Sequence, residues 1–282
     1  DEKHRDVVRR GVRWLIQHQK PDGDLFTGGS RVTHFYSQGI AAMALCEIYG
    51  MTQDPDLREP AQKAVQYIIA TQDPSGGGWR YEPRQESDTS VTGWQLMAMK
   101  SAQMAGLDVP EEPFEKIRGW LVRVQSLERD GRYVYSPSYI DEERNGRRPS
   151  LAMTAEGMLM QIYLGQRRDD PQLLLGADYL KTNLPAMGTS DEPLRNCYYW
   201  YYATAAMYQM QGPYWEAWNN RLGPLLKTSQ VSRGPMAGSW HPTEPVRDAW
   251  AHVGGRVYVT AMHLLMLEVY YRYLPLFQEL SK

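Results

Sequence analysis

The chain has 282 residues, 42% of them hydrophobic, which is enough to bury a large core. Its formal charge of −2 offers no attraction for a polyanion, so no nucleic-acid partner is expected. No apolar run approaches the ~18 residues that span a bilayer, so no transmembrane segment is expected, and the compartment is left open. Cys46 and Cys197 are too few for a disulfide framework and are expected to be buried thiols.

A helix followed by a glycine-rich corner recurs along the chain, and residues 64–79 are its clearest copy. Their apolar positions fall on one face of a helix, Pro74 ends that helix, and the following glycines allow Trp79 to fold back onto it. Gln72 is expected to bond free carbonyl or amide groups at the helix end. Degraded copies lie at residues 14–26, 120–133, 174–183 and 225–240, and Gln19, Gln72 and Gln125 follow at intervals of 53 residues.

A second motif alternates with the first and is rich in Ala, Gly and Met on all sides. It occurs at residues 37–45, 91–99, 153–160, 203–208 and 259–266. A helix that is apolar all round is expected to be buried all round. Each repeat of roughly 55 residues is therefore expected to pair an outer amphipathic helix with an inner buried one.

In chain order, the patterns predict outer helices near residues 4–19, 57–72, 112–126, 171–183 and 214–229. They predict inner helices near residues 35–49, 89–105, 150–165, 194–211 and 256–273, four of them closed by the glycines Gly50, Gly106, Gly165 and Gly212. The long connections run from outer to inner helices, so they gather at the end where the inner helices begin, and function is expected there. The whole chain, residues 1–282, is expected to form one all-α domain.

The corner string Gln72-Asp73-Pro74-Ser75-Gly76-Gly77-Gly78-Trp79 and its copies resemble the glutamine–tryptophan repeats of squalene cyclases. This terpenoid cyclase superfamily is related also to protein prenyltransferase β subunits and has uncharacterised bacterial members. The resemblance covers nearly the whole chain and implies an α/α toroid, in which inner and outer helices surround a central cavity. Those families close the ring with six hairpins, and about five hairpins of roughly 55 residues are counted here.

The chemistry of these families does not carry over to this sequence. Squalene–hopene cyclases protonate an alkene with an Asp-x-Asp-Asp acid, whereas Ser87-Asp88-Thr89-Ser90 offers a single carboxylate at the start of an inner helix. Asp88 is interpreted either as a plain helix cap or as a general acid. Prenyltransferases hold zinc with Asp, Cys and His, but Cys197 lacks that arrangement, so no metal and no cofactor are predicted.

The candidate site residues lie at or near the starts of the inner helices. Asp88 and His34 are the candidate catalytic residues, although a lone histidine is more often structural. The aromatic surplus of 19 Tyr and 9 Trp over 4 Phe favours the walls of a cavity or groove, with ordinary packing as the alternative. The candidate ligand-binding residues are Tyr36, Trp94, Arg195, Tyr198, Tyr199, Tyr202, Arg256 and Tyr258.

Three functions stay open at this point, and whether the chain is an enzyme stays open with them. The first is binding, or an unassigned transformation, of an apolar or isoprenoid-like small molecule in the central cavity. The second is a carbohydrate-active, polysaccharide lyase-like toroid, because the residues around Trp79 and Tyr81 suit stacking on an oligosaccharide. The third is a non-catalytic module whose loop face binds a protein partner.

Overall fold

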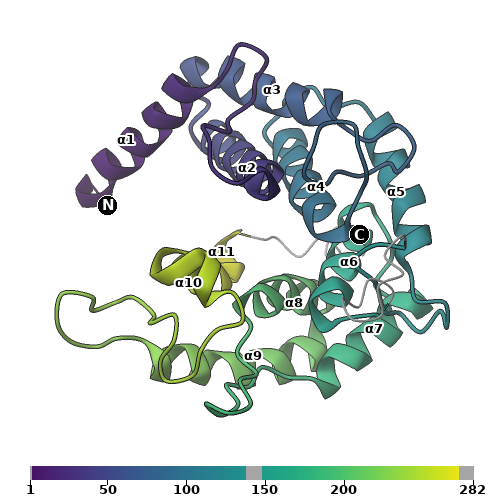
Figure 1. The fold of residues 1–282 in the computed structure, drawn as a ribbon, viewed down its shortest axis with the longest axis vertical. Helices are drawn as coiled ribbons and strands as arrows, with labels where there is room; N and C mark the ends of the chain where they lie inside the picture. Colours follow the sequence, from purple (N-terminus) through teal and green to yellow (C-terminus); the bar gives the residue numbers. More distant parts are fainter. Residues whose placement is uncertain (1, 138–147, 273–282) are drawn as a thin grey trace. The chain divides into compact units, whose positions relative to one another are not determined.

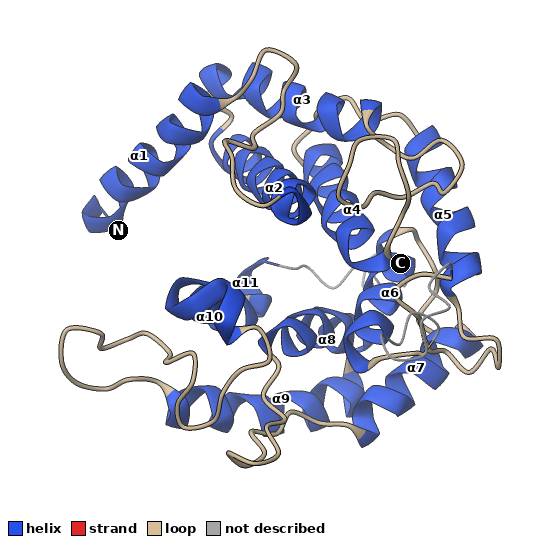
Figure 2. Cartoon of the chain, in the orientation of Figure 1, coloured by secondary structure: helices blue, strands red, loops and turns tan. Residues whose placement is uncertain are grey.

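A computed structural model describes residues 2–137 and 148–272 of the chain. Within these ranges the chain consists of helices, turns and loops, and β-structure is limited to isolated bridges (Figure 2). None of the helices in the same ranges is long and apolar enough to cross a bilayer. The all-α prediction is therefore confirmed.

Contacts between residues divide the chain into two compact units. Unit 1 comprises Asp1–Val124 and Tyr135–Tyr139, and unit 2 comprises Gln125–Val134 and Ile140–Lys282. The single ring-shaped domain over residues 1–282, with its central cavity, stays a prediction.

Unit 1 contains the first inner and outer helices of the array (Figure 1). Its inner helices pack against each other, and α2 also packs against α3 while α4 packs against α5. The inner helix α4 is buried without a break over its first three turns, whereas the outer helix α3 buries one stripe only, as predicted. All-round burial is wrong for the inner helix α2, on which Ile40 is 44% exposed. The elements are α1 (Glu2–His18), the 3-10 turn η1 (Arg31–Thr33), α2 (His34–Thr52), α3 (Pro55–Ala70), α4 (Thr89–Met104) and α5 (Glu112–Val124).

Unit 2 continues the same alternation around α8, which packs against α6, α9 and α10. Helix α8 is buried along almost its whole length, but α10 is not, because Val257 on its far side is 83% exposed. All-round burial, predicted for every inner helix, is therefore wrong for α10. The elements are α6 (Leu151–Tyr163), α7 (Pro171–Thr182), α8 (Cys197–Met210), α9 (Gly212–Ser229), α10 (Ala251–Leu267) and α11 (Val269–Arg272).

Helix ends agree with the predicted ones to within a few residues, with two instructive exceptions. Helix α2 continues through Gly50 to Thr52, and Gln53 takes the left-handed conformation that was expected of the glycine. Helix α10 begins at Ala251, but Gly255 breaks it with a positive φ, so regular helix resumes at Arg256 as predicted. The predicted single helix to residue 273 is wrong, because α10 ends at Leu267 and a separate short helix α11 follows at Val269–Arg272; residue 273 itself lies outside the described residues.

The glutamine–tryptophan corner of unit 1 ties two helices to one turn. The Gln72 side-chain amide donates to the carbonyl of Gly77 in the turn and to that of Pro113 at the start of α5, at 2.9 and 3.1 Å. The indole of Trp79, 1% exposed, donates to the carbonyl of Ile68 on α3 at 2.8 Å. Gln72 thus bonds a carbonyl of the turn and one at the start of the next outer helix, rather than the free groups at the end of α3 that the sequence led us to expect.

The corners at Trp79 and Trp240 are also held to the inner helix that follows them, through a threonine on that helix. The backbone N–H of Trp79 donates to the Thr92 hydroxyl at 3.0 Å, and the backbone N–H of Trp240 donates to the Thr260 hydroxyl at 3.1 Å. The Trp240 indole repeats the bond of Trp79 by donating to the α9 carbonyl of Leu226 at 2.9 Å. These bonds rigidify the loop-bearing ends of the inner helices, where the candidate site residues lie.

Candidate functional site

The candidate acid Asp88 is fully buried at the start of α4. It occupies the N-cap position, where its Oδ1 accepts a hydrogen bond of 2.7 Å from the backbone N–H of Val91. A backbone bridge between Trp79 and Asp88 joins this cap to the corner. Asp88 therefore caps the helix, and its second oxygen remains for other partners.

That second oxygen ends a chain of tyrosine hydroxyls. The Tyr135 hydroxyl donates to Asp88 Oδ2 at 2.8 Å, and the hydroxyls of Tyr81 and Tyr135 lie 2.5 Å apart. Tyr81 and Tyr135 are half-buried, whereas Asp88 is 0% exposed, so the chain leads from the interior toward the surface of unit 1. These three residues are called the Asp88 relay below.

The cation Arg80 lies against the relay. Its guanidinium carbon is 5.0 Å from the ring centre of Tyr81 and 5.9 Å from that of Tyr135, both within cation–π range. Its Nε lies 3.7 Å from Asp88 Oδ2, and its Nη1 pairs with Glu86. Arg80 thus places positive charge beside the carboxyl without contacting it at hydrogen-bond distance.

The environment keeps Asp88 from ionising as readily as an ordinary aspartate. Burial raises the pKa of its carboxyl to about 7, although the hydrogen bonds from Val91 and Tyr135 and the charge of Arg80 act in the opposite direction. Burial, with the charge of Asp88, also raises the pKa of the Tyr135 hydroxyl. A carboxyl with a pKa near neutrality exchanges its proton at neutral pH, as a general acid or base must.

The sequence missed Tyr81 and Tyr135 as partners of Asp88, although the repeat contained a signal for them. Their hydroxyls belong to residues 54 positions apart, so they occupy the same place in successive repeats. The same separation joins the Tyr36 and Ser90 hydroxyls, which are 2.8 Å apart. Equivalent positions in neighbouring repeats therefore meet in space, and tyrosines at such positions can be paired from the sequence alone.

The other two candidates on the unit 1 inner helices lie close to the relay in sequence and fold. Tyr36 on α2 reaches Ser90, two residues after Asp88. Trp94, one helical turn further along α4, is 3% exposed and lies beside Gly39 of α2, where an added side chain would meet its Cβ at 3.0 Å. Tyr36 is thus near the relay, Trp94 packs between the two inner helices, and a ligand-binding role for either stays a prediction.

His34 belongs to a separate cluster at the start of α2. Its Nε2 lies 3.0 Å from Asp24 Oδ1 and 3.3 Å from the Tyr67 hydroxyl, and its ring stacks on Phe26 at a centroid distance of 4.7 Å. Burial alone would raise the pKa of Asp24, but hydrogen bonds from His34 and Lys20 lower it to about 2. This carboxylate therefore orients the imidazole, and a catalytic role for His34 stays a prediction.

In unit 2, Arg195 anchors the long loop that precedes α10. Its side chain is 1% exposed, and Nη1 donates to the carbonyls of His241, Glu244 and Val246 at 2.8 to 3.1 Å. Burial lowers the pKa of Arg195, and the nearby charge of Asp248 counteracts part of that effect. The contacts of Arg195 in this structure are with the protein, and its predicted contact with a ligand stays a prediction.

The tyrosines of α8 divide between two surroundings. The Tyr199 hydroxyl donates to the carbonyl of Asn183 at 2.7 Å and its ring meets Trp218 edge-on, so it packs toward the outer helices. The Tyr198 hydroxyl donates to Glu156 of α6 at 3.3 Å, and its ring centre lies 5.0 Å from that of the fully buried Tyr202. Glu156 is 0% exposed, and the sequence missed it as a partner of these tyrosines.

The last two candidates lie at the start of the regular part of α10. Arg256 donates from Nη1 to the Ser239 hydroxyl at 2.9 Å, which ties α10 to the corner before Trp240. Burial raises the pKa of the Cys197 thiol well above its usual range, and Tyr258 acts on that pKa in the opposite direction. Arg256 thus holds the entrance of α10 in place, and ligand contact by Arg256 or Tyr258 stays a prediction.

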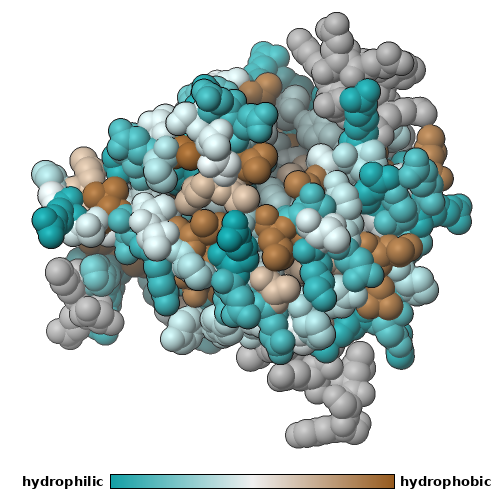
Figure 3. Space-filling model, turned by 90° about the horizontal axis from the view of Figure 1, so that it is seen from below, coloured by the Kyte–Doolittle hydropathy of each residue, from teal (hydrophilic) through white to brown (hydrophobic). Residues whose placement is uncertain are grey.

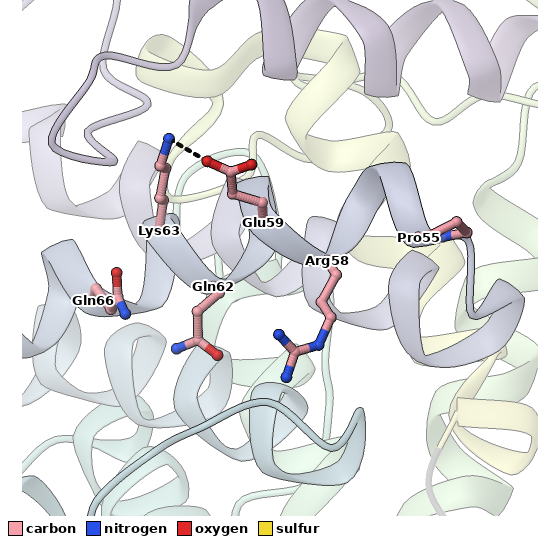
Figure 4. A pocket seen from close by; sticks show the side chains of 6 residues that line it. All are labelled: Pro55, Arg58, Glu59, Gln62, Lys63 and Gln66. Atoms are coloured by element: carbon pink, nitrogen blue, oxygen red, sulfur yellow. Dashed lines mark ion pairs between the residues drawn. The ribbon is translucent and has the colours of Figure 1, made fainter.

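Metal binding finds no support among the described residues, which include no group of three or more His, Cys, Asp and Glu side chains placed to hold an ion. A shallow hollow on α3 is lined by charged and amide side chains, among them the ion pair of Lys63 with Glu59 (Figure 4). Its Gln62 bonds both backbone groups of Asp108, so this surface is structural.

The fold that these helices define is similar to that of type II terpene cyclases, so the resemblance seen in the repeats is confirmed at the level of the fold. It is similar in particular to the type II terpene cyclase MstE from Scytonema, with a TM-score of 0.64 at 13% identity, over 98% of this chain and 76% of that one. MstE bound to geranylgeranyl dihydroxybenzoate, its substrate, gives 0.62 at 15% identity, over 98% and 75% of the two chains. At these identities the likeness concerns the fold.

In sequence, the chain is similar to drimenyl diphosphate synthase from Streptomyces showdoensis. The two are 28% identical over 152 residues, which are 54% of this chain and 26% of the synthase. The match thus spans about a quarter of the length of that curated relative. No protein-family model matches the chain.

Proposed function

We propose that this terpenoid-cyclase-like chain binds an isoprenoid-like small molecule and that Asp88 is the source or sink of a proton for it. The observation that carries the proposal is the Asp88 relay, because a fully buried carboxyl linked to two tyrosine hydroxyls serves proton transfer beyond the needs of a helix cap. The substrate named for MstE bears a geranylgeranyl group, and the curated relative is named for a diphosphate of the same chemical class.

The acid strength of Asp88 limits the chemistry. A carboxyl with a pKa of about 7 gives up its proton less readily than an ordinary aspartic acid. Protonation of an unactivated alkene requires an unusually strong acid, so Asp88 does not suit that step. An oxygen on the ligand, such as a hydroxyl, an ether or a carbonyl, is a more basic acceptor, and we propose an oxygen-bearing isoprenoid.

The structure gives less support to the two alternative functions, a carbohydrate-active protein and a protein-interaction module. The carbohydrate hypothesis relied on the residues around Trp79, but that indole is 1% exposed and bonded to α3, so it offers no face to a sugar. The interaction-module hypothesis concerned the loop face; on the face that Figure 3 shows, seen from below, hydrophobic side chains are interspersed among hydrophilic ones. Neither alternative is favoured by the relatives in sequence or fold.

Thermal melting with added ligands tests the proposal. Geranylgeraniol and geranylgeranyl diphosphate are compared with maltoheptaose at equal concentrations. A ligand at a hundredfold excess over its Kd stabilises the folded state by about 2.7 kcal/mol, which is a shift of several degrees. A rise in Tm with an isoprenoid and none with the oligosaccharide is expected. The proposal is overturned if neither isoprenoid raises Tm.

A further inference from the structure

The carboxyl of Asp88 is sealed from any ligand by its own hydrogen bonds. Oδ1 accepts from the Val91 amide and Oδ2 accepts from the Tyr135 hydroxyl, and the side chain is 0% exposed. Among the described hydrogen bonds of Asp88, the one with Tyr135 is the route by which a proton can leave or reach its carboxyl. Tyr135 in turn lies 2.5 Å from the hydroxyl of Tyr81, which is half-buried.

The direction of the hydrogen bonds in the relay depends on whether Asp88 carries a proton. When Asp88 is ionised, Tyr135 donates to it and Tyr81 donates to Tyr135, so Tyr81 presents only a lone pair outward. When Asp88 is protonated, it donates to Tyr135, and Tyr135 donates to Tyr81. The O–H of Tyr81 is then free to donate outward.

We propose that Tyr81 is the hydroxyl that meets the oxygen of the isoprenoid-like ligand, and that Tyr135 passes the proton between Tyr81 and Asp88. The proposal rests on the proposed function for the identity of the ligand. In the forward direction the Tyr81 proton moves to the ligand oxygen, the Tyr135 proton moves to Tyr81, and the Asp88 proton moves to Tyr135. Three O–H bonds break and three form, and the relay ends with ionised Asp88 and a protonated ligand.

The charges around the relay favour this end state. Arg80 lies over both tyrosine rings and has its Nε 3.7 Å from Asp88 Oδ2, so its positive charge stabilises the carboxylate left behind. Glu86 pairs with Arg80 on its far side and holds it in place, and Tyr36 is the other titratable group near Tyr135. Asp88 and Tyr135 are thus positioning residues, and Tyr81 is the one relay residue that touches the ligand.

Carbon-13 NMR of the full chain, labelled at tyrosine Cζ and aspartate Cγ, tests the relay without any ligand. The Tyr81 resonance should titrate with the same midpoint as Asp88. In Asp88→Asn the side-chain amide donates permanently to Tyr135, so the Tyr81 resonance should stay at its low-pH position at every pH. In Tyr135→Phe the Tyr81 resonance should stop following Asp88. Tyr49→Phe, at the other end of α2, is the matched control and should leave the Tyr81 titration as it is.

The relay is overturned if the Tyr81 resonance is flat while Asp88 titrates, or if it still titrates in Asp88→Asn. The second of these tests holds even where Tyr135→Phe does not fold. In a second arm, added geranylgeraniol should shift the Tyr81 resonance in the wild type and bind at least tenfold more weakly to Tyr81→Phe. A Tyr81 resonance that follows Asp88 in a chain that binds no isoprenoid supports the relay and overturns the proposed function.

Discussion

Replacing Asp88 by asparagine should change how the stability of the chain depends on pH. Asparagine has the same shape, keeps an oxygen for the Val91 amide and does not ionise. In the wild type, the folded-state pKa of about 7 lies above the unfolded value of about 3.9, so folding takes up a proton between these two values. The contribution of Asp88 is therefore fully present below pH 4 and is lost as pH rises through 7.

The size of the effect follows from the two pKa values. One pKa unit corresponds to about 1.4 kcal/mol, so the full difference of about three units amounts to roughly 4 kcal/mol. Between pH 5 and pH 8 the wild type should lose about 2 to 3 kcal/mol of unfolding free energy relative to Asp88→Asn. The direction of this change distinguishes a buried aspartate from an ion-paired one, because the contribution of an ion-paired aspartate to the unfolding free energy is lost as pH falls.

Urea denaturation of both proteins at pH 5, 6, 7 and 8 measures this difference. Asp24→Asn serves as the control: the pKa of Asp24 is lowered to about 2, so its contribution is constant from pH 5 to pH 8 and is lost only as pH falls below that range. If the difference between the wild type and Asp88→Asn stays constant from pH 5 to pH 8, Asp88 is ionised throughout, and the reasoning from its burial is refuted.

Three further predictions concern stability and are measured by the same urea denaturation. Burial lowers the pKa of His263 to about 4, so on acidification the unfolded chain takes up a proton before the folded chain does. Between pH 7 and pH 5 the wild type should therefore lose about 2 kcal/mol of unfolding free energy relative to His263→Gln. Equal losses in both proteins would contradict this prediction. Trp240→Phe removes the indole donor to an α9 carbonyl and should cost about 1 to 3 kcal/mol, and a cost near zero would mean that the bond adds nothing to the corner. Gly131→Ala places a Cβ 2.4 Å from a backbone nitrogen of α7 and should lower the unfolding free energy by more than about 3 kcal/mol. Gly165→Ala, also at positive φ but facing open space, should lower it by about 1 kcal/mol. Similar losses for the two variants would contradict the packing around Gly131.

The helices could be predicted from the sequence because their signals are local. Stripe-forming apolar positions, such as those of α3, and the all-round apolar run of α4 both follow from residues within one helix. The corners were predictable in part, since Trp79 bonds a carbonyl 11 residues away and Gln72 one 5 residues away, but the bond of Gln72 to Pro113, 41 residues away, has no local signal. The end of α2 was not, because Gln53 takes a left-handed conformation that sequence reasoning assigns to glycine.

The partners of the candidate site residues could not be predicted in the same way, because they lie far away in the sequence. Asp88 and Tyr135 are 47 residues apart, and Arg195 and the last carbonyl it binds are 51 apart. Only where both partners occupy equivalent repeat positions, as Tyr81 and Tyr135 do, does the sequence contain a usable signal. Glu156 shows the opposite case, since a buried carboxylate inside an apolar inner helix has no local explanation.

The most direct measurement of whether this fold handles an isoprenoid at the relay is a titration of the labelled chain with geranylgeraniol, followed at the Tyr81 Cζ resonance. The account predicts a saturable shift of that resonance, absent with maltoheptaose. A Tyr81 resonance that stays in place while geranylgeraniol binds elsewhere, or no binding at all, would contradict it.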